Sequence, residues 1–142
     1  MSDVYNLQRF VKAQDRVIDQ VLNELRNGRK TGHWMWFIFP QVEGLGSSST
    51  SRKYALKGLD EARAYLEHPV LGQRLLECCR AIQSVQGKSA SEIMGYPDDL
   101  KLRSSLTLFL LADDSHPEFR EVINQYFQGH LDRRTLELLH VE

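Results

Sequence analysis

The most constraining feature of this sequence is one helix that lacks a polar face. Pro97 opens the stretch DDLKLRSSLTLFLLADD, residues 98–114, and Asp98 and Asp99 fall in its first turn, where the helix dipole favours anions. Its second half is apolar nearly all round, so other elements must enclose it. The longest mainly apolar run, Leu106 to Ala112, has 7 residues, far short of the ~20 that span a bilayer. We therefore expect the central helix of a soluble protein.

The rest of the chain also predicts helices with short connections. From Tyr5 to Arg26 apolar residues recur every three or four positions, which is typical of an amphipathic helix that Asn27-Gly28 then ends. Further helices are expected near Ser51, over Asp60 to Glu67, over Val70 to Val85, after a Ser89 cap with Glu92 three residues later, over Pro117 to Phe127 with Ser115 or His116 as cap, and from an Asp132 cap through His140. No convincing strand pair or repeat is present. The prediction is a mainly α fold, one compact helical domain over residues 1–142, with a buried irregular aromatic segment.

That aromatic segment is HWMWFIFPQ, residues 33–41, which carries both tryptophans. Alternation would place Trp34, Trp36 and Ile38 on one side and Met35, Phe37 and Phe39 on the other, so both faces would be apolar. Because Pro40 disfavours helix at the residue before it, we predict a buried extended or irregular segment. Most of these side chains are expected in the core. His33 and Gln41 bracket them, however, so one tryptophan is a candidate pocket wall.

The loop that follows, VEGLGSSSTS, combines tight turns with exposed amides. In the functional interpretation, its backbone amides lead into a helix N-terminus and form an anion site, to which Arg52 adds charge and Tyr54 a ring or hydroxyl. The simpler interpretation is a solvated linker with Ser51 as an N-cap. The candidate ligand-binding residues of this loop are Gly46, Ser47, Ser51, Arg52 and Tyr54.

Three polar residues on the first turns of the central helix complete the candidate site. Lys101 and Arg103 lie three and four residues after Asp98 and Asp99, so ordinary surface ion pairs explain them. Cations near a helix N-terminus are mildly unfavourable, however, and an anionic ligand would also explain their presence. Ser104 either permits close helix packing or donates its hydroxyl to that ligand.

Composition and motifs exclude several other classes. With 18 basic and 19 acidic residues the net charge is −1, so we expect no nucleic-acid or membrane partner. The five histidines are dispersed, and Cys78 and Cys79 are neighbours without a C-x-x-C pattern, so no metal site is expected. Gly87-Lys88-Ser89 lacks the earlier glycine of a phosphate loop, and no cofactor is predicted. The start lacks the apolar core of a signal peptide, which favours a cytoplasmic protein with reduced cysteines.

Three blocks together carry a family resemblance: HWMWFIFPQVEGLGSSSTSRKY, EARAYLEHPVLGQRL and PDDLKLRSSLTLF. They resemble a bacterial family, domain of unknown function 1810, which is sometimes labelled calpastatin-like. This resemblance covers nearly the whole chain and implies a small, mainly helical fold with no established activity. The label adds nothing, because no segment is similar to an inhibitor of calcium-dependent proteases.

The chain is also distantly similar to the NADAR family, helical proteins linked to NAD and ADP-ribose chemistry that include hydrolases of ADP-ribosylated guanine. The similarity lies in the aromatic entry segment, in Ser51 and Tyr54 at a helix start, and in the later basic helix that ends in Leu-x-Phe. The chain departs from that family at Arg52, where the family has an acidic residue, and it lacks the C-terminal Gly-x-Asn-x-Leu-Gly block. Kinship of fold is therefore compatible with different chemistry.

These observations lead to one principal hypothesis. The segment from His33 to Tyr54 and the start of the helix with Lys101 and Arg103 form one cleft for a phosphorylated nucleotide-like or ADP-ribosyl ligand. In it, Trp34 or Trp36 stacks on a base and the basic residues hold phosphate. If the protein is an enzyme, N-glycosidic hydrolysis is the expected reaction, with His33 as acid or base and Glu43 as the carboxylate.

Two alternatives remain at this stage. The first is a non-enzymatic interaction module, in which the first helix or the C-terminal helices present an apolar stripe to another protein. The second is a nucleic-acid binder, which the net charge and the absence of a long basic stripe in the sequence disfavour. The sequence does not define the oligomeric state.

Overall fold

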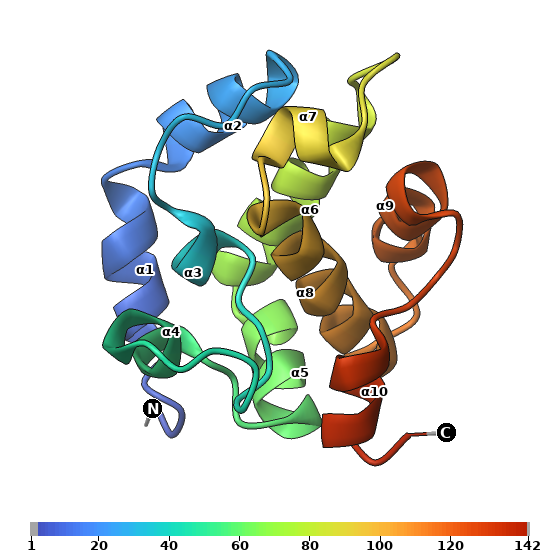
Figure 1. Ribbon diagram of the computed structural model, residues 1–142. Coiled ribbons are helices and arrows are strands. Elements are labelled where there is room, and N and C mark those ends of the chain that lie inside the picture. Colours follow the sequence, from blue (N-terminus) through green and yellow to red (C-terminus); the bar gives the residue numbers. More distant parts are fainter. Residues whose placement is uncertain (1–2, 142) are drawn as a thin grey trace.

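Helix α8 (Asp98–Ala112) runs through the middle of the protein (Figure 1). Its second half is buried nearly all round, and helices α5, α7, α9 and α10 pack against it. The enclosure follows from the sequence, because a helix apolar on every side is stable only when neighbours cover each side. The prediction of a central helix is confirmed.

The computed structural model describes residues 3–141, and within them the chain forms ten helices and no strand. A single isolated bridge between Val42 and Leu56 is the nearest approach to sheet structure in this range. The helices are α1 (Gln8–Asp15), α2 (Ile18–Arg26), α3 (Met35–Ile38), α4 (Ser49–Tyr54), α5 (Leu59–Glu67), α6 (Leu71–Gln83), α7 (Ala90–Met94), α8 (Asp98–Ala112), α9 (Pro117–Phe127) and α10 (Arg133–Leu138). The mainly α prediction is confirmed.

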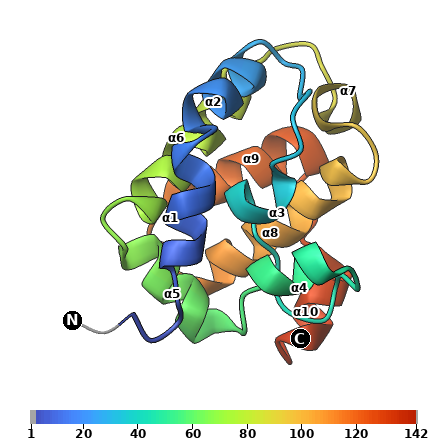
Figure 2. The same cartoon turned by 90° about the vertical axis from the view of Figure 1, so that its left-hand side faces the viewer.

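One hydrophobic core unites these helices. Helix α6 packs against α2, α5 and α9, while α3 lies between α1 and α4 on the face that Figure 2 shows. Cys78 and Cys79, expected to be unpaired, are free and buried within this core, and burial raises the pKa of Cys78 to about 12. Within the described residues, no helix is both long and apolar enough to cross a membrane.

The predicted first helix is wrong in one respect, because it is two helices. The break falls at Arg16 and Val17, where Val17 takes φ −132° and ψ −4°. Helix α1 packs against α3, whereas α2 packs against α6. Gln14 fixes the end of α1, because its buried amide donates to the Phe37 carbonyl at 2.7 Å and to the Tyr65 hydroxyl at 2.9 Å. The two halves of the predicted helix thus pack against different helices, and the chain breaks between them. Tertiary packing overrides the local periodicity here.

The aromatic segment is irregular, as predicted, but it is not extended. Residues 35–38 form the single helical turn α3, and the chain leaves the helical region at Phe39, before Pro40. The side chains therefore follow the helical period rather than alternation. Trp34, Met35, Ile38 and Phe39 are buried, each at most 2% exposed, whereas Trp36 and Phe37 face outward and are half-buried. The prediction that Trp34 and Trp36 lie on the same side of the segment is wrong.

Glu24 of α2 holds this segment in place. Its carboxylate is 8% exposed and accepts hydrogen bonds from the Thr31 N–H at 2.8 Å, the Gly32 N–H at 3.0 Å and the Trp34 indole at 3.0 Å. Gln20 donates a fourth at 2.6 Å. Burial by itself raises the pKa of Glu24, but the hydrogen bonds together outweigh it and lower the pKa to about 2. Glu24 is thus an ionised anchor for the entry of the aromatic segment.

Helix capping accounts for most of the other boundaries. Ser89 and Glu92 form the predicted capping box, and the Asp132 side chain caps α10. Neither candidate cap of α9 is confirmed as a side-chain cap. His116 occupies the N-cap position but makes no side-chain capping bond there, and Pro117 follows it at the first helical position, where proline is favoured.

We expect Glu24→Gln to lower the free energy of unfolding by about 2–4 kcal/mol at pH 7, because a neutral amide accepts these hydrogen bonds less strongly and brings donors of its own. The folded pKa lies below the unfolded one, so the stabilisation by Glu24 is complete above about pH 5 and is lost as the pH falls toward 2. A shift of this size corresponds to roughly 3 kcal/mol.

Urea denaturation of the wild type and the variant between pH 7 and pH 3 measures this effect. The gap between the two proteins should narrow as the pH falls. Glu67→Gln, at an exposed site on α5, is the matched control and should change stability by less than about 0.5 kcal/mol. A gap that stays constant over this range would contradict the assigned role of Glu24.

Candidate functional site

An open pocket lies where the glycine-serine loop meets the first turns of α8. Its volume is about 340 Å³, and its walls come from α3, the loop, the start of α4 and α8. Seven of the residues that the sequence singles out line it: Trp36, Gln41, Gly46, Ser47, Ser51, Lys101 and Ser104. Segments about sixty residues apart in the chain thus meet at one solvent-accessible hollow, which we call the Trp36 pocket.

Trp36 forms the aromatic wall because of its position on α3. Trp34 points into the core toward Glu24, so the residue two positions later on the same helical turn points outward. The Lys101 Nζ lies 5.6 Å from the centroid of the Trp36 ring, within the range of a cation–π contact. An indole face and an ammonium group therefore stand together at this pocket.

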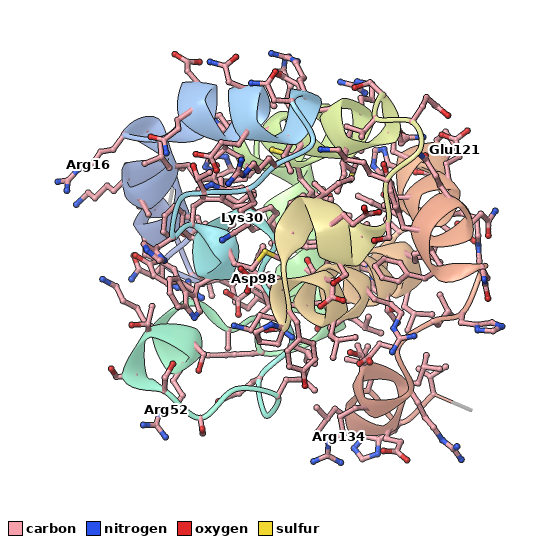
Figure 3. All side chains as sticks on the ribbon, turned by 45° about the horizontal axis from the view of Figure 1, so that its top comes forward. Arg16, Lys30, Arg52, Asp98, Glu121 and Arg134 are labelled. Carbon is pink, nitrogen blue, oxygen red and sulfur yellow. The ribbon has the colours of Figure 1, made fainter. Side chains whose placement is uncertain are left out.

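The charge of Lys101 is shared with a small ionic network. Asp98 Oδ1 lies 3.6 Å from the Lys101 Nζ, and Asp98 Oδ2 lies 2.9 Å from the Lys30 Nζ. The predicted pair between Asp98 and Lys101 is therefore present, and Figure 3 shows Lys30 beside Asp98. Lys30 is the less exposed of the two lysines and is the closer partner, so it carries most of the interaction with Asp98. Lys101 is held loosely, and its ammonium can turn toward a ligand.

The loop differs from its prediction in how α4 begins. Ser48, not Ser51, is the N-cap: its hydroxyl accepts from the Ser51 N–H at 3.1 Å, while the Ser48 carbonyl accepts from the Arg52 N–H at 3.0 Å. The Ser51 hydroxyl in turn donates to the Ser48 carbonyl at 2.9 Å. The Ser51 and Arg52 N–H groups thus bond to Ser48.

Gly46 allows the loop to lie directly on α4. A β-carbon at this position would stand 2.5 Å from the Ser51 Oγ and 2.6 Å from the Ser51 Cβ, closer than real contacts permit. Behind this contact the loop is closed by the Val42 and Leu56 bridge, where the Glu43 N–H donates to the Leu56 carbonyl at 2.8 Å. These contacts hold the loop against α4 at the rim of the pocket.

Several predicted residues lie elsewhere. Trp34 is sealed in the core at 1% exposure, and His33 is exposed outside the pocket. Glu43 and Arg52 line a different hollow, next to Arg9. Tyr54 lies behind the pocket and lines a narrow extension of it with Trp36, and its ring packs 5.4 Å from that of Phe37.

Arg103 points to another part of the protein. Its guanidinium lies 3.9 Å from Asp132, at the start of α10, and 5.8 Å from the Phe127 ring of α9. The pair with Asp99 expected from helical spacing is not the one that forms. Lys101 and Arg103 are two positions apart, about 200° around the helix, so they face different neighbours. The structure therefore separates the two cations that the sequence grouped together.

The sequence reasoning missed the apolar rim. Leu45, Pro97 and Leu100 also line the pocket, and Leu100 is 41% exposed. Leu100 stands four residues before Ser104, on the same helix face, and the Ser104 hydroxyl donates to the Leu100 carbonyl at 3.1 Å. This spacing was readable from the sequence. Loop placement was not, because the position of Leu45 depends on how the loop closes.

The lining of the Trp36 pocket offers an aromatic ring, hydrogen-bonding groups and one cation. Its lining includes an indole, a carboxamide, serine hydroxyls and one ammonium group, with no carboxylate or imidazole among the lining residues. Within the described residues, no cluster of three or more histidine, cysteine, aspartate or glutamate side chains is placed to hold a metal ion. Small-molecule sites commonly combine apolar and aromatic walls with a few polar groups that fix the orientation of the ligand.

Comparisons with known proteins extend the picture without assigning an activity. A family model described as "Protein of unknown function (DUF1810)" matches residues 4–139. The crystal structure of the conserved hypothetical protein Rv1873 from Mycobacterium tuberculosis is similar, with 52% sequence identity and a TM-score of 0.96. The similarity covers 99% of this chain and 100% of that one. The comparison with curated proteins found no match.

We expect Gly46→Ala to disturb the pocket locally, because the added methyl group must displace Ser51 and the first turn of α4. The expected loss of unfolding free energy is about 1–3 kcal/mol, the usual cost of a forced contact. Thermal denaturation measures it, with Ser47→Ala, at an exposed neighbouring site, as the control that should stay close to wild type. Equal stability of the Gly46→Ala variant and the control would show that the loop does not rest on α4 in this way.

Proposed function

Because the chain belongs to the DUF1810 family, whose description assigns no activity, we propose its function from its own geometry: the Trp36 pocket binds a small phosphorylated, nucleotide-like ligand. In this proposal Trp36 contacts a planar base, Lys101 contacts a phosphate, and the polar groups between them contact a sugar.

The observation that carries the proposal is the pairing of Trp36 with Lys101. A half-buried indole offers a flat apolar face, and stacking of a base on such a face is sequence-tolerant and favourable by about 1–3 kcal/mol. The Lys101 ammonium, 5.6 Å from the ring centroid, is long and flexible enough to leave the ring for an anionic oxygen. A base and a phosphate at the two ends of one ligand match these two groups.

The remaining polar groups fit the middle of such a ligand. Gln41 contributes a carboxamide that both donates and accepts, and Ser47 contributes a hydroxyl beside it. The Ser104 hydroxyl already donates to the Leu100 carbonyl, so toward a ligand it acts as an acceptor. Hydroxyl-rich groups of this kind recognise ribose-like polyols by hydrogen bonds that need no charge.

The size of the pocket favours a compact ligand. At about 340 Å³ it is at the lower end of the range for small-molecule sites, roughly 300–1,000 Å³. A nucleoside monophosphate fits this volume, whereas ADP-ribose would fill it with one half and extend over the rim at Leu45 and Leu100. The similarity to the NADAR family makes ADP-ribose the second ligand to test.

The proposal stops at binding. N-glycosidic hydrolysis needs a carboxylate beside the ribosyl centre, and His33 and Glu43, the groups suggested for catalysis, lie outside the Trp36 pocket.

The alternative of an apolar stripe that binds a partner protein has less support. The large hydrophobic side chains exposed in the described residues are Val4, Tyr96 and Leu100, and none of these lies on α1, α9 or α10.

Isothermal calorimetry with adenosine 5′-monophosphate, adenosine, ADP-ribose and NAD tests the proposal. We expect the monophosphate to bind more tightly than adenosine. Lys101→Gln should weaken monophosphate binding about tenfold, the loss of one charge-assisted contact, and leave adenosine unchanged. Arg103→Gln, two positions away but facing Asp132, is the matched control and should not change the affinity for either ligand.

Tryptophan fluorescence supplies an independent measurement. Ligand should quench the wild type but not Trp36→Phe, in which the buried Trp34 is the remaining tryptophan. Absence of heat from all four compounds at millimolar concentration would eliminate the proposed ligand class. An equal effect of Lys101→Gln on adenosine and its monophosphate would eliminate the phosphate contact.

A further inference from the structure

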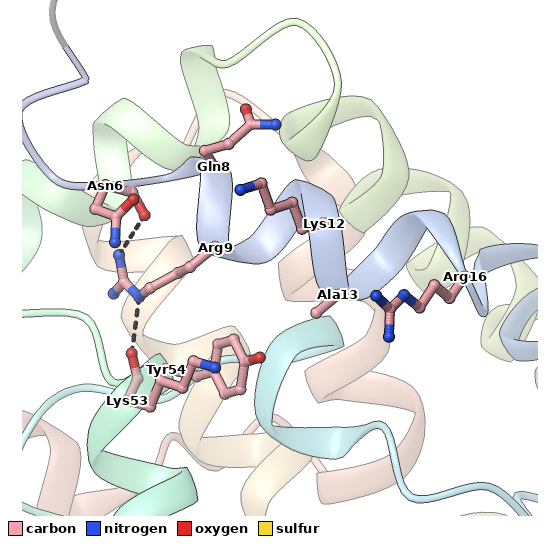
Figure 4. Close-up of a pocket in the computed structure, with 8 residues that line it drawn as sticks. All are labelled: Asn6, Gln8, Arg9, Lys12, Ala13, Arg16, Lys53 and Tyr54. Atoms are coloured by element: carbon pink, nitrogen blue, oxygen red, sulfur yellow. Dashed lines mark hydrogen bonds between the residues drawn. The ribbon is translucent and has the colours of Figure 1, made fainter.

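A second hollow, separate from the Trp36 pocket, lies between α1 and α4 (Figure 4). Its volume is about 360 Å³. Four cationic side chains line it, and no carboxylate is among the lining residues: the cations are Arg9, Lys12, Arg16 and Lys53. The hollow is therefore strongly electropositive on a protein whose net charge is −1.

Arg9 lines this hollow, and contacts with the protein hold its side chain in place. Its guanidinium donates to the carbonyls of Tyr5 and Lys53 and pairs with the buried Glu61 carboxylate at 3.0 Å. It also lies 4.4 Å over the Phe10 ring. These contacts account for the arginine without any ligand, because it joins the N-terminal segment, α4 and α5.

The other three cations have no such explanation. Lys12 of α1 and Arg16, the C-cap residue of that helix, are exposed and lie four positions apart, so they stand on one face. Lys53 faces them from α4, with its Nζ 5.3 Å from the centroid of the Tyr54 ring. Within residues 3–141, none of the three has a carboxylate within 4.0 Å, although like charges gathered around one hollow repel each other.

The positive surface continues past Lys53. A neighbouring hollow of about 330 Å³ shares Asn6, Arg9 and Lys53 with the first and adds Arg52 and Lys57. One carboxylate, Glu43, lines it. Arg16 lines the first hollow and Arg52 the second, and Figure 3 shows both side chains extending outward from the protein. We call this continuous surface the α1–α4 track.

We propose that the α1–α4 track binds the phosphate backbone of single-stranded nucleic acid. Two adjoining open hollows suit an extended anion with repeated charges better than a compact one, and the cations that line them supply a contact for each of several phosphates. Tyr54 provides an aromatic ring at the wall, as in other single-strand grooves. The α1 part of the track is 8 residues, about 12 Å, so a site of a few nucleotides is expected.

The expectation of no nucleic-acid partner depended on net charge and on the lack of a basic stripe in the sequence. The stripe exists only in three dimensions, because Lys12 and Arg16 come from one helix and Arg52, Lys53 and Lys57 from a segment about forty residues later. Over a Debye length of about 8 Å, a strand in the track responds to these local charges rather than to the sum over the chain.

Fluorescence anisotropy with a labelled oligothymidine of twelve nucleotides tests the proposal, at about 50 mM salt and above. Binding should weaken with salt, with a slope of log Kobs against log salt of about −3.5 for five contacts on a single strand, from Lys12, Arg16, Arg52, Lys53 and Lys57. The triple variant Lys12→Gln, Arg16→Gln, Lys53→Gln should make this slope shallower by about 2 and lose most of the affinity. Arg29→Gln, Arg120→Gln, Arg133→Gln removes the same charge at exposed sites outside the track and should keep the slope.

Circular dichroism verifies that both triple variants keep the helical content of the wild type, since all six side chains are exposed. Three outcomes would overturn the proposal: no binding by the wild type at 50 mM salt, an equal loss in both triple variants, or complete displacement of the strand by equimolar tripolyphosphate, which would indicate a small polyphosphate ligand instead. None of these variants alters the Trp36 pocket, so the two proposed sites succeed or fail separately.

Discussion

The placement of Glu24 determines how the aromatic segment enters the fold and which of its two tryptophans faces solvent. Its buried carboxylate accepts two backbone N–H groups and the Trp34 indole, and this fixes the entry of the aromatic segment against α2. With Trp34 fixed inward, the single turn of α3 rotates Trp36 by about 200° and leaves it facing outward. The aromatic wall of the pocket is therefore a consequence of a buried, hydrogen-bonded anion twelve residues earlier in the chain.

The two halves of helix α8 have different structural roles. Its second half is the centre of the core, and this rigid position holds the first turns at the surface. Lys101 and Arg103 differ by two positions, so the same helix sends one cation to Trp36 and the other to Asp132 on α10. Residues that look equivalent in sequence thus take part in separate structures, one at the pocket and one in helix packing.

The distribution of charge illustrates the same point. Opposite charges are nearly balanced over the chain, but the short helices α1 and α4 place cations from two segments along one surface. A net charge near zero limits the long-range attraction of charged ligands. A local surface can still be strongly positive, because charges act mainly within a Debye length. The Trp36 pocket and the α1–α4 track are neighbours through Tyr54, which lines the first hollow of the track and the narrow extension behind Trp36.

Local chemistry in the sequence was sufficient to predict the helices whose ends carry a cap or a proline, such as α7 with Ser89 and Glu92. It was also sufficient to predict that the centre of α8 is buried. It also singled out most residues of the pocket by type. It failed at Val17 and in α3, where a break and a turn arise because the flanking residues pack against different partners. Capping and periodicity act over one or two turns, so the sequence encodes them directly. Which tryptophan is exposed, and which cation it meets, depends on contacts between distant segments, and only the folded chain decides them.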